Sequence, residues 1–204
     1  MSEKPILFNT EMVRAILEGR KTVTRRILKL PNYIKQSEDN PELYTLFAEG
    51  CCYENQHMEE LTLYLKSPYE SGEILYVRET WAKDYFGNYV YMADYVGTTI
   101  SPEWKWKPSI HMRKEAARIW LRVTDVRVER LNDITKEQAG REGVTWETDN
   151  SGLMRISQFI KLWNSTLKKS DYDKYCWNAN PWVWVIEFER CEEPSGQQEG
   201  GTNE

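Results

Sequence analysis

The stretch from Gly19 to Arg26 holds the residues whose types and spacing best suit chemistry, with two hydroxyls and four cations within eight residues. A hydroxyl is a weak nucleophile until a neighbouring base takes its proton. A lysine can be that base only if burial or nearby cations lower its pKa. Lys21 and Thr24 are therefore a candidate base and a candidate nucleophile, and the three arginines of the stretch are the nearby cations.

The geometry of this pair depends on where the strand after Gly19 begins. The segment from Lys21 to Thr24 contains β-branched residues, which favour a strand. In a regular strand, residues three apart point to opposite faces, so the two side chains converge only if the turn continues past Lys21. The alternative interpretation is a solvated basic strand that does no chemistry.

The element before this stretch is expected to be a short helix. Residues 10–18 place Val13, Ile16 and Leu17 on one apolar face, at i, i+3 and i+4. Gly19 stands where a helix commonly ends in a residue with positive φ. The hydroxyls and cations therefore follow a sharp turn at the end of a helix.

The spacing Gly19-x-Lys21-x-x-Thr24-x-Arg26 resembles the motif of the ASCH domain, a branch of the PUA-like β-barrels. Most members carry Glu at the position of Thr24. The threonine form resembles small bacterial amidohydrolases that remove the acetyl group from N(4)-acetylcytidine, in which the motif lysine and threonine act with a glutamate on a later helix. The resemblance implies that Lys21 and Thr24 are catalytic and that a glutamate partner lies downstream.

Glu142 is the candidate for that partner. A capping box from Thr135 to Gln138 predicts the start of a short helix, and Gly143 predicts its end. A carboxylate in the last turn is disfavoured by ~0.3–1 kcal/mol, which indicates a role beyond the helix itself. Aligned on the start of the corresponding helix in the amidohydrolases, Glu142 matches their catalytic glutamate. Glu137, on the exposed first turn, is the alternative.

A second group of candidate residues follows a predicted strand at residues 74–79. The strand ends in Arg78, Glu79 and Trp81, and this end would place polar and aromatic groups at the rim of a barrel. The alternative is an Arg–Glu surface pair, worth at most about 1 kcal/mol. The run from residue 72 to residue 81 also resembles ASCH proteins carried by phages and prophages.

Residues 82–112 are rich in Tyr and Trp, and the run 106–112 again resembles the phage-type proteins. These aromatic rings can stack on bases or can pack an insertion onto the barrel, and the sequence leaves both possibilities open. His111 can bind substrate or move a proton, or it can be structural. The predicted substrate-binding residues are Arg25, Arg26, Arg78, Glu79, Trp81, Lys107, Ser109 and His111.

The composition limits the class of protein. A hydrophobic content of 40% with nine Trp allows a real core, and a net charge of −5 argues against a strongly basic nucleic-acid binder. We recognise no signal peptide and no apolar run near the ~20 residues of a membrane span, so we expect a cytoplasmic protein without a membrane partner. Four Cys without a CxxC pair, together with two His, do not suggest a metal site.

The predicted fold class is α+β, a PUA-like (ASCH) mixed β-barrel with flanking helices. We expect a single domain over residues 1–191, with insertions at about 31–72 and 82–112, and a disordered tail over 192–204. Two strand-like runs within the first insertion, 43–47 and 61–65, could pair as a hairpin. Further predicted elements are a long β segment at 117–131, a helix at 154–167 and a closing strand at 181–188.

Two functions are compatible with these residues. The first is an amidohydrolase without metal or cofactor that acts on an acylated nucleoside or base through Lys21, Thr24 and Glu142. The alternative is a non-catalytic, PUA-like module that binds RNA or a modified nucleotide, and the phage-type resemblance implies a phage origin for it. Its phosphate contacts would come from Lys21, Arg25, Arg26, Arg78 and Lys107. In either case the partner is a nucleoside or a short single strand, and the oligomeric state stays open.

Overall fold

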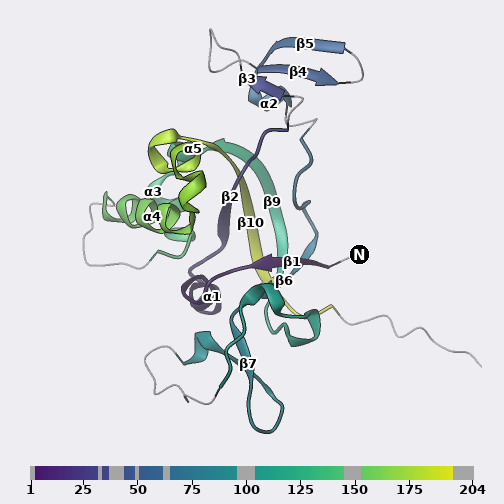
Figure 1. Ribbon diagram of the computed structural model, residues 1–204, viewed down its shortest axis with the longest axis vertical. Coiled ribbons are helices and arrows are strands. Elements are labelled where there is room, and N and C mark those ends of the chain that lie inside the picture. The colour runs from purple at the N-terminus through teal and green to yellow at the C-terminus, as the bar shows by residue number, and fades with distance from the viewer. Residues whose placement is uncertain are drawn as a thin grey trace, which may run out of the picture. The chain divides into compact units, whose positions relative to one another are not determined.

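The computed structural model of the chain describes residues 3–31, 34–36, 44–48, 51–61, 65–95, 104–144 and 153–194 (Figure 1). The strands are β1 (Lys4–Leu7), β2 (Val23–Ile27), β3 (Ile34–Gln36), β4 (Tyr44–Ala48), β5 (Cys51–Gln56), β6 (Ile74–Arg78), β7 (Trp81–Lys83), β8 (Tyr89–Tyr91), β9 (Trp120–Arg130) and β10 (Trp182–Cys191). The α-helices are α1 (Thr10–Leu17), α2 (Met58–Leu61), α3 (Lys136–Arg141), α4 (Leu153–Thr166) and α5 (Tyr172–Tyr175).

The chain divides into two compact units. The first unit comprises Met1–Arg14, Gly72–Arg122 and Glu189–Glu204, and the second comprises Ala15–Ser71 and Val123–Phe188. Along the chain, α1, β9 and β10 each pass from one unit into the other. The expectation of a single domain remains a prediction.

Two strand pairings organise the first unit. β1 runs parallel to β6, with Ile6 opposite Val77, and β6 runs antiparallel to β9, with Leu75 opposite Leu121. These four side chains are buried because the strands present apolar residues to a common core. β7 and β8 pair as a separate antiparallel hairpin within the predicted second insertion.

The sheet of the second unit is built on the pairing of β2 with β10. The two strands are antiparallel, with Thr24 opposite Ile186 and Arg26 opposite Trp184. Because side chains alternate along a strand, these four side chains belong to one face of the sheet and Arg25 belongs to the other. The register therefore assigns the hydroxyl of Thr24 and the guanidinium of Arg25 to opposite faces.

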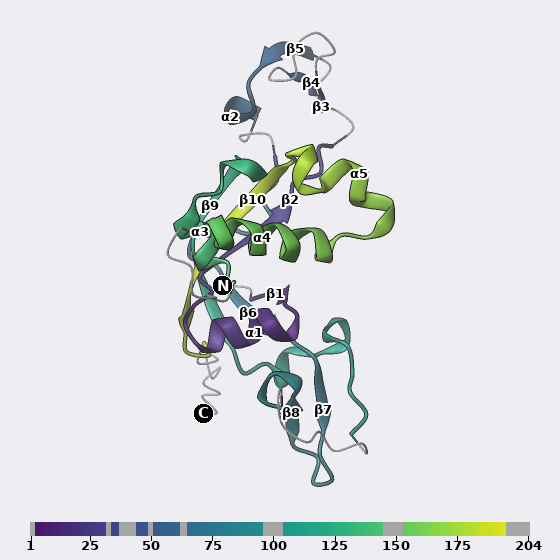
Figure 2. The ribbon, with the colours of Figure 1, turned by 90° about the vertical axis from the view of Figure 1, so that its left-hand side faces the viewer.

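Each face of this sheet has its own core. Figures 1 and 2 show α3 and α4 beside β2 and β10 on one of these faces. The core on the helix side contains Val23, Leu131, Ile134, Ala139, Val144, Phe159, Trp163, Val183 and Val185. The core on the other side contains Leu28, Ile34, Tyr44, Leu46, Met58, Leu61 and Leu65, against which Val128, Trp182 and Trp184 pack.

The α+β class is confirmed, but the predicted closed barrel is not found. Among the strands that the structure describes, β1 and β2 stand at the two ends of the strand order, so their sheet is open. The sheet does not continue past β2 because residues beside the free edge of β2 pair instead with the end of α3. The amide of Thr22 donates to the carbonyl of Arg141 at 2.9 Å, and Lys21 forms an isolated β-bridge with Glu142.

The predicted first insertion forms its own small sheet. β4 lies between β3 and β5, and both neighbours are antiparallel to it. The predicted hairpin between 43–47 and 61–65 is therefore wrong, because β4 pairs with β3 and β5, and Leu61 ends α2. Residues 62–64 lie outside the described part of the chain, as does most of the predicted tail, from residue 195 on.

Local signals for helix ends are confirmed. Thr135 and Gln138 form a capping box at the start of α3, and Gly143 follows its C-cap residue with φ at 90°. Gly19, two residues after the end of α1, has φ at 75°. Glu142 is the C-cap of α3, as its place before Gly143 predicts.

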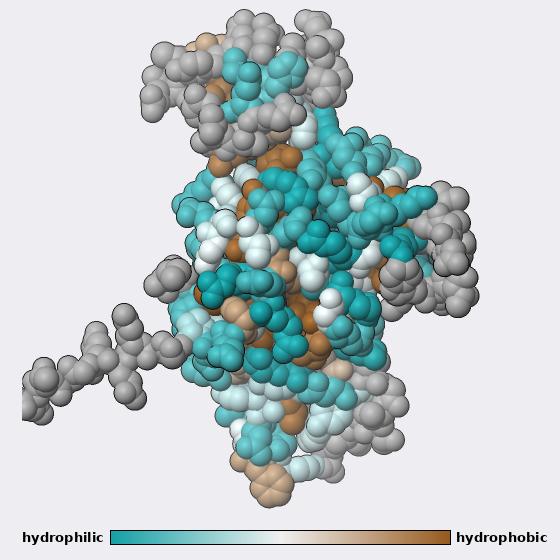
Figure 3. All heavy atoms as spheres, turned by 180° about the vertical axis from the view of Figure 1, so that it is seen from behind, coloured by the Kyte–Doolittle hydropathy of each residue, from teal (hydrophilic) through white to brown (hydrophobic). Residues whose placement is uncertain are grey.

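No helix in the described ranges is both long enough and apolar enough to cross a membrane. Figure 3 shows hydrophilic residues over most of the face in view, with smaller apolar areas between them.

Candidate functional site

The turn after α1 places Lys21 ahead of the strand. The amides of Arg20 and Lys21 both donate to the carbonyl of Ala15, at 2.9 and 3.0 Å, and thereby close the end of the helix. β2 begins only at Val23, so Lys21 lies outside the regular strand. The turn itself covers Glu18 and Gly19, and Lys21 already forms a β-bridge with Glu142.

The ammonium of Lys21 is buried among oxygen atoms. Its Nζ donates to the carbonyl of Val23 at 2.8 Å, to the carbonyl of Glu142 at 2.9 Å and to Glu142 Oε2 at 2.8 Å. The side chains of Lys21 and Glu142 are 0% and 4% exposed. A lysine and a glutamate 121 positions apart thus form a pair that solvent screens little.

Arg25 holds the other oxygen of the same carboxylate. Its Nη1 lies 3.1 Å from Glu142 Oε1, and its Nη2 donates to Glu129 Oε2 at 3.2 Å and to Gln138 Oε1 at 3.0 Å. We call Lys21, Arg25 and Glu142 the buried charge cluster. Arg25 was predicted to bind substrate, but its side chain has no exposed surface and contacts Glu142.

The surroundings of Lys21 in the cluster favour its neutral form more than water would. Burial lowers the pKa of Lys21 because it disfavours the charged form, and the nearby Arg26 and Arg25 lower it further. The charge and hydrogen bond of Glu142 oppose this shift, but the pKa of Lys21 still lies below its usual value of 10.5. A lysine that acts as a base requires a shift in this direction.

Thr24 lies next to this cluster along the backbone. It is 1% exposed. Lys21 Nζ donates to the carbonyl of Val23, so it lies against the peptide group that joins Val23 to Thr24. A reaction through these residues requires the Thr24 hydroxyl to lie within hydrogen-bonding reach of Nζ.

The cluster also has a structural consequence. The carbonyl of Thr22 accepts from the amide of Phe188, and the amide of Leu28 donates to the carbonyl of Trp182. Even-numbered residues of this segment therefore direct backbone polar groups toward β10. The carbonyl of Val23 therefore faces the free edge of β2, where Lys21 satisfies it. Covering an edge in this way prevents pairing with another chain.

The other two candidates in the second unit are Arg26 and Glu137. Arg26 is half-buried in β2 opposite Trp184, and burial lowers its pKa. Glu137 is exposed on the first turn of α3, as expected for the alternative to Glu142.

The remaining predicted substrate-binding residues belong to the first unit. Glu79 is 1% exposed, and its partner is Arg118, with oxygen–nitrogen distances of 2.9 and 3.1 Å, rather than Arg78. Arg78 donates instead to the carbonyl of Ile110. Arg118 also donates to both carboxylate oxygens of Asp94, at 2.9 and 2.7 Å. The predicted Arg78–Glu79 surface pair is therefore not the contact that the structure shows.

Trp81 and Lys107 meet through both backbone and side chain. Their peptide groups exchange hydrogen bonds of 3.2 and 2.7 Å, and Lys107 Nζ lies 4.9 Å from the centre of the Trp81 ring. Ser109 and His111 are the two ends of a short 3-10 turn, and the imidazole of His111 is exposed. These candidates belong to the first unit, and the buried charge cluster belongs to the second.

A pocket of about 530 Å³ in the second unit was not predicted from the sequence. Its lining comes from Met58, from residues 65–71 and from β9 and β10. The local sequence signal for this pocket is the spacing of Trp182 and Trp184, which places both indoles on one face of β10. A strand with two indoles on one face needs a partner surface there. In the described residues, no group of three or more His, Cys, Asp or Glu could hold a metal ion.

No family model matches the chain, and no curated protein matches it. Two solved structures are similar to it at low identity. Protein EF3133 from Enterococcus faecalis V583, described under the family DUF984, is 11% identical with a TM-score of 0.43, and the match covers 100% of this chain and 85% of that one. An ASCH domain from Lactobacillus crispatus JV V101 is 10% identical with a TM-score of 0.38, over 87% and 70% of the two chains. Both scores are low, so the function proposed for this chain rests on its own geometry.

Proposed function

We propose that this chain is an amidohydrolase that removes an acyl group from the exocyclic amine of a nucleoside or base, as in N(4)-acetylcytidine. Thr24 is the nucleophile, Lys21 is the general base and acid, and Glu142 positions Lys21. One observation carries the proposal: a fully buried lysine with a lowered pKa lies between a carboxylate and the peptide group before a buried threonine. A lowered pKa supplies the neutral amine that nucleophilic catalysis by a hydroxyl requires.

The reaction has two halves. In the first, the neutral amine of Lys21 takes the proton of Thr24 Oγ1 while that oxygen attacks the amide carbon. The carbon–nitrogen bond then breaks, and the Lys21 ammonium gives its proton to the leaving amine. In the second half, water attacks the threonine ester with Lys21 again as base, and it releases a carboxylic acid and the free hydroxyl. Both steps need the hydroxyl to approach Nζ, and such contacts often tighten only with substrate bound.

Glu142 serves this cycle by fixing the lysine. Its Oε2 accepts from Lys21, while its Oε1 accepts from Arg25, so the carboxylate is held from two sides. Arg25 is in turn held by Gln138 and Glu129. This arrangement orients the Lys21 nitrogen before substrate arrives, which is how positioning lowers a reaction barrier.

The test is incubation with N(4)-acetylcytidine and a panel of other acylated nucleosides and bases, followed by chromatography. Thr24→Val removes the nucleophile and keeps the shape of the side chain, so turnover is expected to fall by at least about 100-fold. Thr45→Val, at a half-buried position of β4, is the matched control. If Thr24→Val turns over as fast as Thr45→Val, this mechanism is wrong.

A second candidate function is the binding of a single-stranded nucleic acid without reaction. The observation that favours it is a row of cations and rings in the first unit. Lys83 Nζ lies 5.1 Å from the centre of the Tyr89 ring, Lys107 Nζ lies 4.9 Å from that of Trp81, and the two rings are 5.5 Å apart. Lys21 and Arg25 are buried, so they do not present their charges to phosphates. Binding of an oligonucleotide that weakens steeply with salt, in a protein without turnover, would support this function over the first.

A further inference from the structure

Glu129 joins the buried charge cluster to a row of charged side chains that reaches solvent. Its Oε2 accepts from Arg25 Nη2 at 3.2 Å, and its Oε1 accepts from Arg127 Nε at 2.6 Å. The Glu129 side chain is 20% exposed, whereas the Arg25 side chain has no exposed surface. Glu129 is therefore the residue through which the buried cluster meets the partly solvated charges of β9.

The row continues from Arg127 to Glu187 of β10 and Arg141 of α3. Arg127 Nη1 donates to Glu187 Oε1 at 2.8 Å, and Arg141 Nη2 donates to Glu187 Oε2 at 2.5 Å. Arg127 also donates to Asp125 at 2.6 Å. Cations and carboxylates therefore alternate along the row, and Glu187 lies between two arginines, as Glu129 does.

These charged side chains lie on the helix side of the sheet. Val185 lies opposite Arg25, and Glu187 lies opposite Val23. Both valines belong to the core on the helix side, so the charged residues opposite them share that face. Glu129 reaches the same face because it bonds to Arg25. The row therefore continues the core under α3 and α4, on the face opposite to that of the two indoles of β10.

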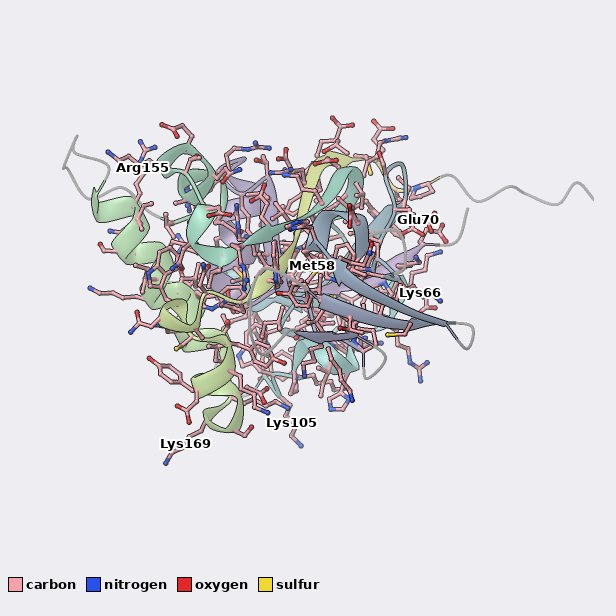
Figure 4. The ribbon with its side chains drawn as sticks, turned by 90° about the horizontal axis from the view of Figure 1, so that it is seen from above. Met58, Lys66, Glu70, Lys105, Arg155 and Lys169 are labelled. Carbon is pink, nitrogen blue, oxygen red and sulfur yellow. The ribbon has the colours of Figure 1, made fainter. Side chains whose placement is uncertain are left out.

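The charges around Lys21 and Arg25 come from a small number of elements. The charged side chains that face Lys21 or its turn come from the end of α3, from β2 and from the turn after α1, and they are Glu142, Arg25, Arg26 and Arg20. From α4, the centre of the Phe159 ring lies 5.9 Å from the guanidinium carbon of Arg25. Figure 4 shows Arg155 of α4 toward the periphery, and this residue lies beside Gly140 of α3. The carboxylates that face Arg25 are thus Glu142 and Glu129, within the described part of the chain.

The division of the Arg25 charge between these two carboxylates affects Lys21. Glu142 accepts from both cations, through Oε2 from Lys21 and through Oε1 from Arg25. While Glu129 offsets part of the charge of Arg25, more of the charge of Glu142 is left to stabilise the ammonium of Lys21. Without the charge of Glu129, Arg25 would draw on Glu142 alone and would repel the ammonium more strongly. Solvent screens these buried groups little, so the change would reach the lysine.

We propose that Glu129 is a positioning residue of the hydrolase site, which holds Arg25 against Glu142 and thereby controls the charge of Lys21. The proposal rests on the hydrolase function and adds a residue of the partly exposed row to its machinery. Glu129 acts through Arg25 and Glu142 and takes no part in the bond changes at Thr24.

Glu129→Gln tests this role through the pH dependence of hydrolysis. The amide keeps an oxygen that can accept from Arg25, but the negative charge is lost. The neutral amine of Lys21 then forms more easily, so kcat/KM is expected to level off at a pH lower by about 0.5 unit or more. A residue with only a structural role would change stability and leave this midpoint in place.

Glu187→Gln is the matched control. The side chains of Glu187 and Glu129 are 19% and 20% exposed, and each accepts from Arg127. The second partner of Glu187 is Arg141, which is not the arginine that holds Glu142. Both variants therefore lose bonds to two arginines, but only Glu129→Gln is expected to move the midpoint. Melting curves show that each variant keeps the fold.

Gln138→Glu tests the same coupling in the opposite direction and decides the matter if Glu129→Gln does not fold. Gln138 Oε1 accepts from Arg25 Nη2 at 3.0 Å and from the amide of Thr135 at 3.0 Å. A glutamate at this position also completes a capping box with Thr135, so α3 is expected to be kept. The added carboxylate offsets more of the charge of Arg25, so the midpoint is expected to rise.

A direct titration of Lys21 separates this proposal from the hydrolase. In protein labelled at lysine Cε, NMR follows the side chain without turnover, and the signal that is missing in Lys21→Arg belongs to Lys21. If Glu129→Gln and Glu187→Gln have the same midpoint, or if Gln138→Glu lowers it, the role of Glu129 is wrong, while turnover by the unaltered protein keeps the hydrolase. If the unaltered protein has no turnover but its Lys21 signal responds to the variants as expected, the hydrolase fails and the control of Lys21 by Glu129 stands.

Discussion

Lys21 and Glu142 meet through both side chain and main chain. The lysine nitrogen donates to the carboxylate oxygen at 2.8 Å and to the carbonyl oxygen of the same residue at 2.9 Å, and the two residues form an isolated β-bridge. The backbone bridge limits the positions that the two side chains can adopt, and the side-chain hydrogen bond in turn holds the two backbone segments together. The pair therefore links the turn after α1 to the end of α3.

The first prediction concerns the loss of the charge of Glu142. Glu142→Gln leaves the buried cations of Lys21 and Arg25 without their shared carboxylate, and removing one partner of a buried ion pair costs ~3–5 kcal/mol. We expect the free energy of unfolding in urea to fall by about that amount. Glu115→Gln changes an exposed carboxylate of the first unit and is expected to stay within ±0.5 kcal/mol, roughly. Equal unfolding midpoints for the two variants would show that the cluster contributes no stability.

The second prediction concerns the pH dependence of hydrolysis. A general base acts in its neutral form, and burial places the pKa of Lys21 below its usual value of 10.5. The fraction of neutral amine rises as pH rises, so kcat/KM should rise with pH and level off at a pKa below 10.5. The measurement is a pH–rate profile with N(4)-acetylcytidine.

Lys21→Arg provides the control for that assignment. Arginine keeps a positive charge for Glu142, but its guanidinium remains protonated throughout this range. Turnover should therefore be lost at every pH of the profile. A Lys21→Arg enzyme with the rising profile of the unaltered protein would assign the titration to another group.

Patterns formed by residues close together in the sequence predicted the local structure well. The positive φ values of Gly19 and Gly143, the capping box at Thr135 and the helix near residues 154–167 each follow from a few neighbouring residues. The apolar face of α1 is likewise a local pattern. Such features depend on backbone conformation and caps, which the sequence specifies directly.

The contacts of the site depend on long-range packing, and the sequence reveals fewer of them. Arg25 and Glu142 are 117 positions apart, and Glu79 and Arg118 are 39 apart, so no spacing rule joins either pair. Arg25 was expected to bind substrate because it belongs to the basic stretch that holds Lys21 and Thr24. The pocket at Trp184 depends on how the first insertion folds over β10, and its strands were paired incorrectly from the sequence.

The third prediction concerns acid stability and rests on Glu187. Burial raises the pKa of this carboxyl, but hydrogen bonds from Arg141 and Arg127 outweigh burial and lower the pKa below 4.5. A carboxyl with a lowered folded pKa stabilises the protein above its unfolded value of 4.5, and this contribution is lost as pH falls through the folded pKa. Glu187→Gln should therefore lower the free energy of unfolding near neutral pH and make less difference in acid.

Glu189→Gln is the matched control on the same strand. Its carboxylate is 62% exposed, and its contact with Arg122 is 3.9 Å long, so little stability is expected from it at either pH. Urea unfolding of both variants near neutral pH and below pH 4.5 measures the difference. If Glu187→Gln lowers the free energy of unfolding as much in acid as at neutral pH, the role assigned to the ion pairs is contradicted.

The last prediction compares two glycines that share a backbone conformation. Gly143 and Gly87 have φ values of 90° and 87°, so alanine at either position is strained by ~1–2 kcal/mol. At Gly143 a Cβ atom would lie 2.7 Å from Ala15 Cβ and 3.0 Å from Lys21 Cβ, whereas nothing lies within 4 Å at Gly87. Gly143→Ala should therefore lose a further ~1–3 kcal/mol through overpacking, measured by urea unfolding. It should also reduce hydrolysis in the folded protein, because the clash displaces the Lys21 side chain, while Gly87→Ala keeps full turnover. Equal losses of stability at the two positions would mean that α1, Lys21 and the end of α3 are not packed as closely as these distances require.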